Sequence, residues 1–393
     1  MLSFLENERF SKTYIKRRRG KKSIKIILIY LIFIVLFIYL SIYFHSFKKN
    51  LIKNYETIIN QNDKLIKKIQ KLEKAIGLKH ISYSFNNSTI NEEETEIFDS
   101  ELEKKYIDNQ HHFCQSNDLF IDKEIDNKIK KVRAHLGNIS FEMYVYKSDD
   151  YVSDSISGSG SWESSSMRKI INCLNYYSQK KKLSKKEITV LDIGANVGWY
   201  SFYLANDGYK LYSFEVSSIN SYILKKNFCL NENINVTIIN KGIGLKEEKC
   251  LLHHPSHNIG NAVILCGENS KISRNTKNLT EEVEFTKLSN YYDFLSEKNI
   301  ALIKLDVEGS EGKVINSGIE FISKYHVPFL IVEFNNDYLK LQGTDPKKIL
   351  EIFEQNGYLF SMGDFFSKTY LSIDQILKLK SPNLYIIYSK FLE

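Results

Sequence analysis

The sequence has few of the residues that break or bend a chain. Its 393 residues include four prolines and 18 glycines, which excludes collagen-like and proline-rich classes. Wholesale disorder is also excluded, because 43% of the residues are hydrophobic and 13% are aromatic, and such a chain can build a core. The length allows one large domain or two modest ones, with further attachments.

The sequence also lacks the cysteine and histidine patterns of a metal site. Its five cysteines form no Cys-x-x-Cys pair and stand at positions 114, 173, 229, 250 and 266. We favour buried free thiols, with a Cys250–Cys266 bridge as the alternative. Pro255 interrupts the histidine-rich run that ends at His257, and no carboxylate cluster accompanies that run. We therefore interpret this run as a solvated loop and predict no metal. The alternative is that His257 acts as a base on the acceptor side.

A strong charge of one sign is missing from most of the chain. The formal net charge of +7 arises within residues 1–25, which hold nine Lys and Arg against two Glu. Of the totals of 54 basic and 47 acidic residues, 45 of each remain for the other 368 residues, so their charges cancel. The body of the protein therefore gives no support for a nucleic-acid partner.

An apolar run follows the basic tail. No formally charged residue occurs from Ile26 to Phe44, and the run extends to Phe47 if His45 is neutral. A helix of this length covers the hydrocarbon core of a bilayer, which is about 30 Å thick. A cleaved signal peptide, the main alternative, has a shorter apolar region and a small-residue cleavage site, and neither is evident here. The run predicts a transmembrane anchor at residues 26–47.

The charges that flank this run predict its orientation. Eight basic residues lie closely before it, whereas only Lys48, Lys49 and Lys53 follow closely. Because basic residues remain on the cytosolic side, residues 1–25 form a cytosolic tail and the rest of the chain is lumenal or extracellular. We expect a single-pass type II protein of the Golgi or the endoplasmic reticulum, with a lumenal C-terminal domain.

A stem is predicted between the anchor and the body, at residues 48–78. Apolar residues recur there at alternating intervals of four and three, as in a coiled coil, with one Asn in the seam. The positions are Leu51, Tyr55, Ile58, Asn62, Leu65, Ile69, Leu72 and Ile76. We favour a homodimer through residues 51–76 over a lone amphipathic helix. Residues 79–130 are polar and acidic, and we interpret them as a spacer.

The remaining residues, 131–393, alternate strand and helix patterns. Strands are expected at 188–193, 210–216, 234–240, 300–306, 327–334, 358–362 and 384–389, with helices at 217–230, 310–325 and 346–356. This order predicts an α/β fold with a parallel sheet, helices on both faces and a ligand at the carboxyl ends of the strands. Residues 242–299 predict an extra hairpin and helix over the site, and residues 153–166 a loop or flap.

A glycine loop and an acidic residue follow the first two of these strands. Gly194 and Gly198 allow a sharp turn and a close approach to a ligand at a helix N-terminus. The loop lacks the GxGxxG triple of a dinucleotide site, and Asp192 beside it suits a ligand with a cationic end. Glu215 ends the second strand, where a carboxylate accepts hydrogen bonds from ribose hydroxyls. These residues favour S-adenosylmethionine over a nicotinamide cofactor.

Three motifs resemble those of the FkbM-type methyltransferases. They are residues 190–198, with the sequence VLDIGANVG, Phe214-Glu215, and residues 303–311, with the sequence IKLDVEGSE. The resemblance covers roughly residues 151–388. It implies a doubly wound, Rossmann-like methyltransferase sheet of seven strands and the transfer of a methyl group from S-adenosylmethionine, usually to a hydroxyl oxygen.

The resemblance also implies roles for particular residues. Asp192, Gly194 and Gly198 would bind the methionine end of the cofactor, and Glu215 would bind its ribose. Asn196, in the same loop, is also predicted to bind the cofactor. The family's Trp-Glu pair corresponds to residues 162–163, and its Asn-x-Gly element begins at Asn258, which we place on the acceptor side. The chain departs from the family at position 216, where Val stands in place of a frequent Pro.

A charged set is expected at the ends of the fourth and fifth strands. Asp306 and Glu308 would flank the methyl-transfer site, and we predict them to be catalytic, as a proton acceptor or in orienting the acceptor. Lys304 and Glu333 are predicted to bind the acceptor. For the segment Glu333-Phe334-Asn335, capping of the next helix is the alternative. For Glu311 we favour a structural place in the first turn of the next helix.

The sequence as a whole predicts a membrane-anchored O-methyltransferase that acts on a hydroxyl acceptor, a glycan or a glycolipid. Two alternatives stay open. The first is a catalytically inactive scaffold of the same fold that associates through its stem, and the second is a methyltransferase for a protein or a lipid.

Overall fold

The computed structural model describes residues 92–115, 123–231, 233–254, 262–266, 280–296, 298–380 and 382–393. The chain divides into two units, Met1–Thr89 and Ile90–Glu393, and all described residues belong to the second. The predicted tail, anchor and stem (1–25, 26–47 and 48–78) lie outside the described residues, as does Asn258. Within the described part of the chain, no helix combines the length and the apolar character needed to cross a bilayer.

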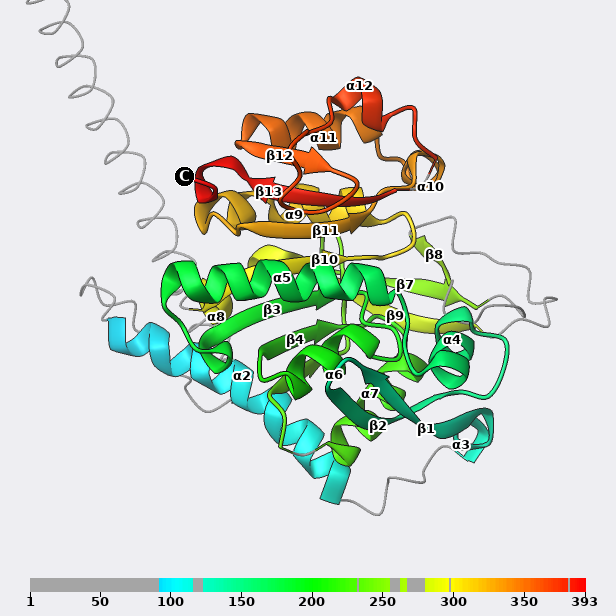
Figure 1. The fold of residues 1–393 in the computed structure, drawn as a ribbon. Coiled ribbons are helices and arrows are strands. Elements are labelled where there is room, and N and C mark those ends of the chain that lie inside the picture. Colours follow the sequence, from blue (N-terminus) through cyan, green and yellow to red (C-terminus); the bar gives the residue numbers. More distant parts are fainter. Residues whose placement is uncertain are drawn as a thin grey trace, which may run out of the picture. The chain divides into compact units, whose positions relative to one another are not determined.

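A seven-stranded sheet forms the centre of the second unit (Figure 1). Its strand order is β12-β13-β11-β10-β3-β4-β5, and β13 alone runs antiparallel to both of its neighbours. The strands are β3 (Ile188–Ile193), β4 (Lys210–Phe214), β5 (Val236–Ile239), β10 (Asn299–Leu305), β11 (Phe329–Glu333), β12 (Tyr358–Ser361) and β13 (Asn383–Tyr388). The predicted α/β fold and its seven-stranded sheet are confirmed.

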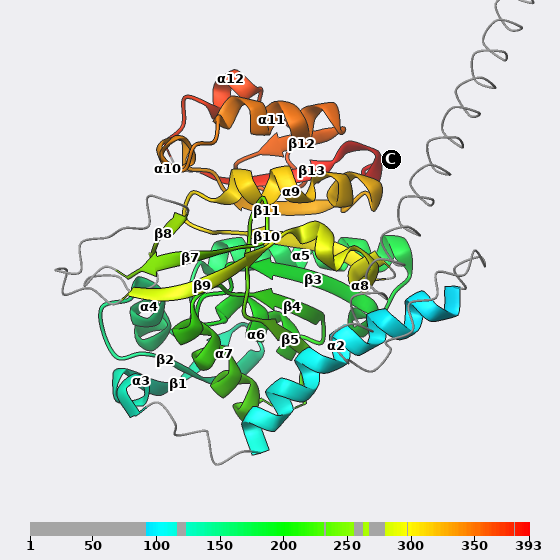
Figure 2. The ribbon, with the colours of Figure 1, turned by 180° about the vertical axis from the view of Figure 1, so that it is seen from behind.

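Helices cover both faces of this sheet (Figures 1 and 2). One face carries α5 (Ser164–Lys181), α6 (Trp199–Asn206) and α7 (Ser218–Leu230), and the other carries α8 (Tyr292–Ser296), α9 (Glu311–Lys324) and α11 (Pro346–Gln355). All six residues of β3 are buried, as expected for a parallel strand covered on both sides. Its successive side chains face opposite layers, because Val190 packs in the core of the first face and Leu191 in that of the second.

The other elements surround this three-layer arrangement. They are α3 (Lys123–Lys128), the antiparallel hairpin of β1 (Ile129–Leu136) and β2 (Ile139–Tyr146), α4 (Tyr151–Ser159), α10 (Asn336–Leu341) and α12 (Ile373–Ile376). The expectation of a loop at residues 153–166 is wrong, because α4 and the start of α5 occupy that stretch. Asp150 begins α4 by accepting a hydrogen bond of 2.7 Å from the backbone N–H of Ser153.

The predicted polar spacer at 79–130 is wrong over residues 92–115, which form helix α2 (Glu92–Gln115) and pack against the domain (Figure 2). The Gln110 side chain donates to the Val236 carbonyl (2.7 Å) and accepts from the Ile238 N–H (3.1 Å). Because β5 is an edge strand, this amide satisfies backbone groups that no neighbouring strand pairs. A disulfide between Cys114 and Cys229 also joins α2 to α7.

The long insertion builds a second sheet, with the order β6-β9-β7-β8. Its strands are β6 (Gly242–Ile243), β7 (Glu248–His253), β8 (Val263–Cys266) and β9 (Thr280–Thr286). The predicted hairpin is present as β7 and β8, the predicted helix as α8, and the Cys250–Cys266 disulfide joins the two hairpin strands. The preference for free thiols is therefore wrong for four cysteines and holds for Cys173, which is buried and free.

Candidate active site

A cavity of about 480 Å³ lies at the carboxyl ends of the central strands. The segments that follow β3, β4, β10 and β11 line it, together with residues of α4 and of the strands β7 and β8. A ligand site at this edge of the sheet was predicted, because a crevice forms there in open α/β sheets. The volume is in the range typical of small-molecule sites.

The loop between β3 and α6 turns tightly at one end of this cavity. Three of its residues have positive φ, namely Gly194 (86°), Asn196 (51°) and Gly198 (95°). The N–H groups of Gly194 and Ala195 both donate to the carbonyl of Phe214, at 2.9 and 3.0 Å, which ties the loop to the end of β4. The predicted residues Gly194 and Asn196 line the cavity, while Gly198 begins α6 behind them.

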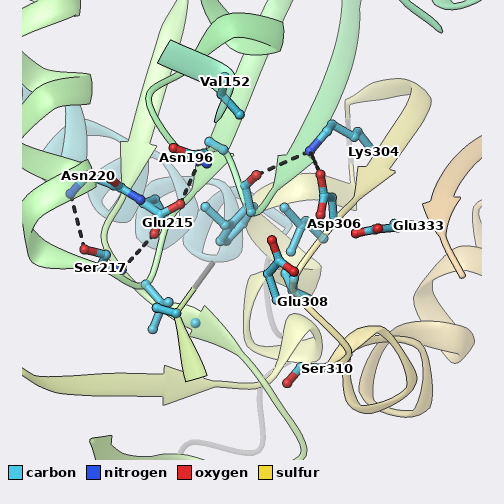
Figure 3. Close-up of a pocket in the computed structure, with 18 of the residues that line it drawn as sticks. Val152, Asn196, Glu215, Ser217, Asn220, Lys304, Asp306, Glu308, Ser310 and Glu333 are labelled. Carbon is cyan, nitrogen blue, oxygen red and sulfur yellow. Dashed lines mark hydrogen bonds and ion pairs between the residues drawn. The ribbon is translucent and has the colours of Figure 1, made fainter. Parts of the chain in front are cut away.

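Glu215 follows β4 and faces this loop across the cavity edge (Figure 3). Its two carboxylate oxygens each accept one backbone hydrogen bond of 2.8 Å, from the N–H of Asn196 and from that of Ser217. The Asn220 side chain is a third donor to Glu215. A carboxylate can accept about four hydrogen bonds, so Glu215 can still accept one from a ribose hydroxyl. Burial raises the pKa of Glu215 to about 7, although the two N–H groups act to lower it.

Asp192 does not line the cavity, contrary to its predicted contact with a cofactor. Its side chain is 1% exposed and accepts a hydrogen bond of 2.6 Å from the Ser201 hydroxyl. Its other oxygen lies 3.7 Å from the ammonium group of Lys304. Burial raises the pKa of Asp192, and Lys304 opposes that rise. Asp192 is therefore a buried partner of the Lys304 ammonium group, and its side chain is not accessible to a ligand in the cavity.

Lys304 connects the loop to the acidic end of the cavity (Figure 3). Its Nζ lies 3.3 Å from the carbonyl oxygen of Gly194 and 3.2 Å from a carboxylate oxygen of Asp306. Burial acts to lower the pKa of Lys304, but the carboxylates of Asp306 and Asp192 outweigh it and raise the pKa above its ordinary value. The side chain lines the cavity as a lysine that stays charged.

Three of the predicted residues place their carboxyl groups together at the end of the cavity opposite Glu215 (Figure 3). They are Asp306, Glu308 and Glu333. Burial raises the pKa of Glu308 to about 8, and Asp306 and Glu333 raise it further by repulsion. Burial likewise raises the pKa of Glu333, with Asp306 the next largest cause. Carboxyl groups with pKa values near neutrality can exchange protons at working pH, so this end of the cavity is suited to proton transfer.

Glu311 lies beside this group and has the structural place that we favoured. It is the first residue of α9, is 1% exposed, and accepts hydrogen bonds from the N–H groups of Val307 (2.9 Å) and Gly309 (3.2 Å). Asn335 is likewise structural, because its side chain caps α10 by accepting from two backbone N–H groups at 3.1 Å.

Backbone strain is concentrated at the cavity. Of the six described non-glycine residues with positive φ, the three that line the cavity are Glu163 (42°), Asn196 (51°) and Glu308 (55°). Such residues persist where the surrounding structure fixes them, and they cluster at functional sites. Glu163 is fixed by Tyr200, whose hydroxyl donates to it at 2.6 Å, and by the amide of Asn383 at 3.3 Å.

One further group at the cavity was missed. His254 is 2% exposed, lines the cavity, and has its Nε2 2.8 Å from a carboxylate oxygen of Glu281. The same oxygen accepts a hydrogen bond of 2.8 Å from the hydroxyl of Ser217, two residues after Glu215. The histidine run suggested a solvated loop, because no local signal shows that the end of β7 lies beside β9 and the loop after β4.

Solved structures of methyltransferases are similar to this chain at low identity. They include magnesium protoporphyrin IX methyltransferase from Synechocystis PCC 6803 with bound S-adenosylmethionine (13% identity, 61% of this chain and 84% of that chain, TM-score 0.30). They also include precorrin-6y C5,15-methyltransferase from Geobacter metallireducens GS-15 (12%, 55% and 86%, TM-score 0.28) and the bifunctional kinase-methyltransferase WbdD (13%, 57% and 39%, TM-score 0.32). A comparison with curated proteins finds no match. Residues 192–360 match the family described as the methyltransferase FkbM domain.

Proposed function

We propose that this chain, an enzyme with a methyltransferase FkbM domain at residues 192–360, uses S-adenosylmethionine to methylate a hydroxyl group of a glycan or a glycolipid. The predicted family and the predicted methyltransferase class are confirmed by the domain match. The cofactor, the acceptor and the membrane attachment are the parts that we propose.

The observation that carries this proposal is the division of the cavity into two chemically different ends. Glu215 and the Gly194–Gly198 loop lie at one end, and Asp306, Glu308 and Glu333 at the other (Figure 3). The first end fits a nucleoside, because Glu215 presents a carboxylate beside the tight loop that begins at Gly194. The second end fits the group that receives the methyl.

The chemistry needs little from the protein beyond alignment and proton removal. S-Adenosylmethionine, when bound, supplies an electrophilic methyl group: the acceptor oxygen forms a bond to its carbon, the carbon–sulfur electron pair stays on sulfur, and the hydroxyl proton is released. Asp306 and Glu308 would orient the acceptor hydroxyl and take its proton, because their carboxylates face the cavity. Lys304 would hold Asp306 in place through its 3.2 Å contact.

The charge of the second end supports a hydroxyl acceptor. Carboxylates accept hydrogen bonds from hydroxyl groups, whereas they repel phosphate and carboxylate groups. Partly exposed Trp162 also lines the cavity and offers an apolar surface beside these polar groups. A neutral, hydroxyl-rich acceptor such as a glycan suits this combination best.

We place the enzyme in the Golgi or the endoplasmic reticulum, as a single-pass type II protein anchored by residues 26–47 and paired as a dimer through residues 51–76. The two disulfides of the body, Cys114–Cys229 and Cys250–Cys266, support an oxidising compartment, because such bonds are rare in cytosolic proteins. They therefore favour a body on the lumenal side of the membrane.

Methyl transfer tests the proposal directly. The full chain, solubilised from membranes, is incubated with labelled S-adenosylmethionine and a hydroxyl-rich glycan extract of those membranes. We expect label in the glycan fraction. We expect Glu308→Gln to lower turnover about 10²-fold or more while cofactor affinity is retained, the usual scale for losing an acid–base or orienting group.

Glu320→Gln is the matched control. Glu320 lies on α9, the helix that follows the loop of Glu308, and its side chain is exposed and does not line the cavity. This variant should behave like the unmutated chain. Label that appears only in protein would contradict the glycan acceptor, and full turnover in Glu308→Gln would remove that residue from the catalytic group. Binding of the cofactor without transfer to any fraction would favour an inactive scaffold.

A further inference from the structure

The carboxylates at the acceptor end form a closer group than the reaction scheme requires. One oxygen each of Asp306, Glu311 and Glu333 lies within 4.8 Å of the other two. The three residues come from the end of β10, the first turn of α9 and the end of β11. Because β10 and β11 are parallel neighbours in the sheet, their carboxyl ends meet at one edge and bring these side chains together. Glu308 faces the same side of the cavity (Figure 3).

Acidic side chains outnumber basic ones at this point. Lys304 is one cation, and it is placed between Asp306 at 3.2 Å and Asp192 at 3.7 Å. Three further acidic side chains, Glu308, Glu311 and Glu333, lie at the same strand ends, so five acidic groups and one lysine are brought together. Crowding carboxylates of like charge in a partly buried site is costly unless protons or cations neutralise them.

Glu311 supplies a second and independent observation. It is 1% exposed, and its Oε1 accepts the two backbone hydrogen bonds from Val307 and Gly309. Its other oxygen, Oε2, is buried and has no hydrogen-bond partner among the described residues. A buried carboxylate oxygen without a hydrogen-bond partner destabilises the fold. A bound cation is one way in which such an oxygen can be neutralised.

We propose that Asp306, Glu311 and Glu333 bind one divalent cation, of the hard, oxygen-preferring class of Mg²⁺ and Mn²⁺. The inference rests on the proposed function, which places the methyl acceptor at this end of the cavity. It departs from the expectation of a metal-free site, because no sequence pattern shows that β10, α9 and β11 bring their carboxylates together. All three ligands are carboxylate oxygens, which such cations prefer over nitrogen or sulfur ligands.

The cation has a defined part in methyl transfer. Three protein ligands leave open positions in an octahedral shell, and these can take water or the hydroxyl oxygens of the acceptor. A hydroxyl group that contacts the cation loses its proton more readily, because the positive charge stabilises the oxygen anion. Glu308, beside the cation and facing the cavity, is then placed to receive that proton.

Binding of Mn²⁺ alone to the full chain tests this site without cofactor or acceptor. The chain is treated with a chelator, separated from it and titrated with Mn²⁺, while free Mn²⁺ is followed by electron paramagnetic resonance. We expect one bound ion per chain, and a loss of affinity of at least about tenfold in Glu333→Gln and in Asp306→Asn. The Asp306 side chain is 39% exposed, so we expect Asp306→Asn to fold. This variant therefore tests the site even if Glu333→Gln does not fold. Glu320→Gln should bind Mn²⁺ as the unmutated chain does.

The outcomes separate this inference from the proposed function. Absence of Mn²⁺ binding, or equal binding in the unmutated chain and in both cavity variants, would overturn the cation site. Methyl transfer that continues at the same rate in chelator would overturn it too, while leaving the O-methyltransferase in place; the carboxylates would then be neutralised by protons or by the cofactor. A chain that binds Mn²⁺ at these residues but methylates no hydroxyl would support the cation site and overturn the proposed function.

Discussion

Gly194 lies so close to Asp306 that a Cβ atom at position 194 would stand 1.8 Å from the backbone carbonyl oxygen of Asp306. The contact arises because β3 and β10 are parallel neighbours that pair Ile193 with Leu305, and each turns away from the sheet one residue later. The N–H of Asp306 also donates to the carbonyl of Ile193 at 3.1 Å. The loop after β3 and the acidic end of β10 are therefore packed directly against each other.

Gly194→Ala should disrupt this packing. The residue has φ of 86°, which costs an alanine about 1–2 kcal/mol, and the collision with the Asp306 carbonyl adds about 1–3 kcal/mol. Gly343→Ala is the matched control, because φ there is 78° but no atom lies within 4 Å of the added Cβ. Chemical unfolding followed by tryptophan fluorescence should show a larger loss for Gly194→Ala, together with lost cofactor binding. Equal losses in the two variants would show that the close approach is unimportant.

Glu215 should control cofactor affinity and make it depend on pH. Glu215→Gln removes a charged acceptor, so we expect S-adenosylmethionine binding to weaken by about 1.5–3 kcal/mol in calorimetry. With a pKa of about 7, the ionised fraction of Glu215 rises about tenfold between pH 6 and pH 8, and the affinity of the unmutated chain should rise by a similar factor. Glu354→Gln, an exposed residue of α11, should retain both the affinity and its pH dependence. A pH-independent affinity in the unmutated chain would remove Glu215 from the cofactor site.

The same raised pKa acts on stability in the opposite direction. Between pH 4.5 and about 7 the folded chain holds a proton on Glu215 that the unfolded chain has released. The free energy of unfolding of the cofactor-free chain therefore falls as pH rises through this window, as far as this group contributes. Cofactor binding strengthens over the same window, so added S-adenosylmethionine should raise the melting temperature more at pH 8 than at pH 6.

The central strands could be predicted because their residues are mostly apolar and end in distinctive turns. The run at 188–193 matches β3 residue for residue, and the second strand was predicted to extend two residues beyond the end of β4 at Phe214. The helix after it was expected from residue 217, and Ser217 is the residue that caps α7 by accepting a hydrogen bond from the Asn220 N–H. Local propensity and capping decide these boundaries, so a single sequence contains them.

Features that depend on distant partners could not be predicted. Helix α2 is polar, and it attaches through Gln110 to the edge of β5 and through Glu103 to Lys210, more than 100 residues away. The pairing of Cys114 with Cys229 and of His254 with Glu281 likewise follows from the fold. Asp192 was assigned to the ligand from its place beside the loop, but strand alternation turns its side chain under the loop.

The two disulfides should contribute unequally to stability. Cys114 and Cys229 are separated by 115 residues and Cys250 and Cys266 by 16, and a longer loop restricts the unfolded chain more. In the chain-entropy account, the double alanine variant of the first pair should lose about 4–5 kcal/mol and that of the second about 3 kcal/mol. Denaturant unfolding of the two variants measures the difference.

The second pair should instead affect methyl transfer. Leu252 and Ile264 line the cavity, and they lie on β7 and β8, the strands that the Cys250–Cys266 disulfide joins. Without the disulfide these strands are held together less firmly, so this side of the cavity becomes less well defined. We expect lower turnover in the Cys250→Ala/Cys266→Ala variant than in the Cys114→Ala/Cys229→Ala variant at a temperature where both are folded. The reverse order would show that α2, and not the hairpin, shapes the site.

The predicted topology can be tested on sealed microsomes with two readouts. If residues 26–47 span the membrane with residues 1–25 in the cytosol, added protease should remove only about the first 25 residues.

A lumenal body should also carry N-linked glycans. Asn138, in an Asn-Ile-Ser triplet, is exposed in the turn between β1 and β2, and Asn235, in an Asn-Val-Thr triplet, is exposed just before β5. Asn138→Gln should remove one glycan and shift the mobility of the chain, and glycosidase should abolish the difference. Asn233→Gln changes an exposed asparagine outside any acceptor triplet and should leave the mobility unchanged. Digestion of the body in intact vesicles, with no glycan on either asparagine, would place the body in the cytosol, where the two disulfides would be hard to maintain.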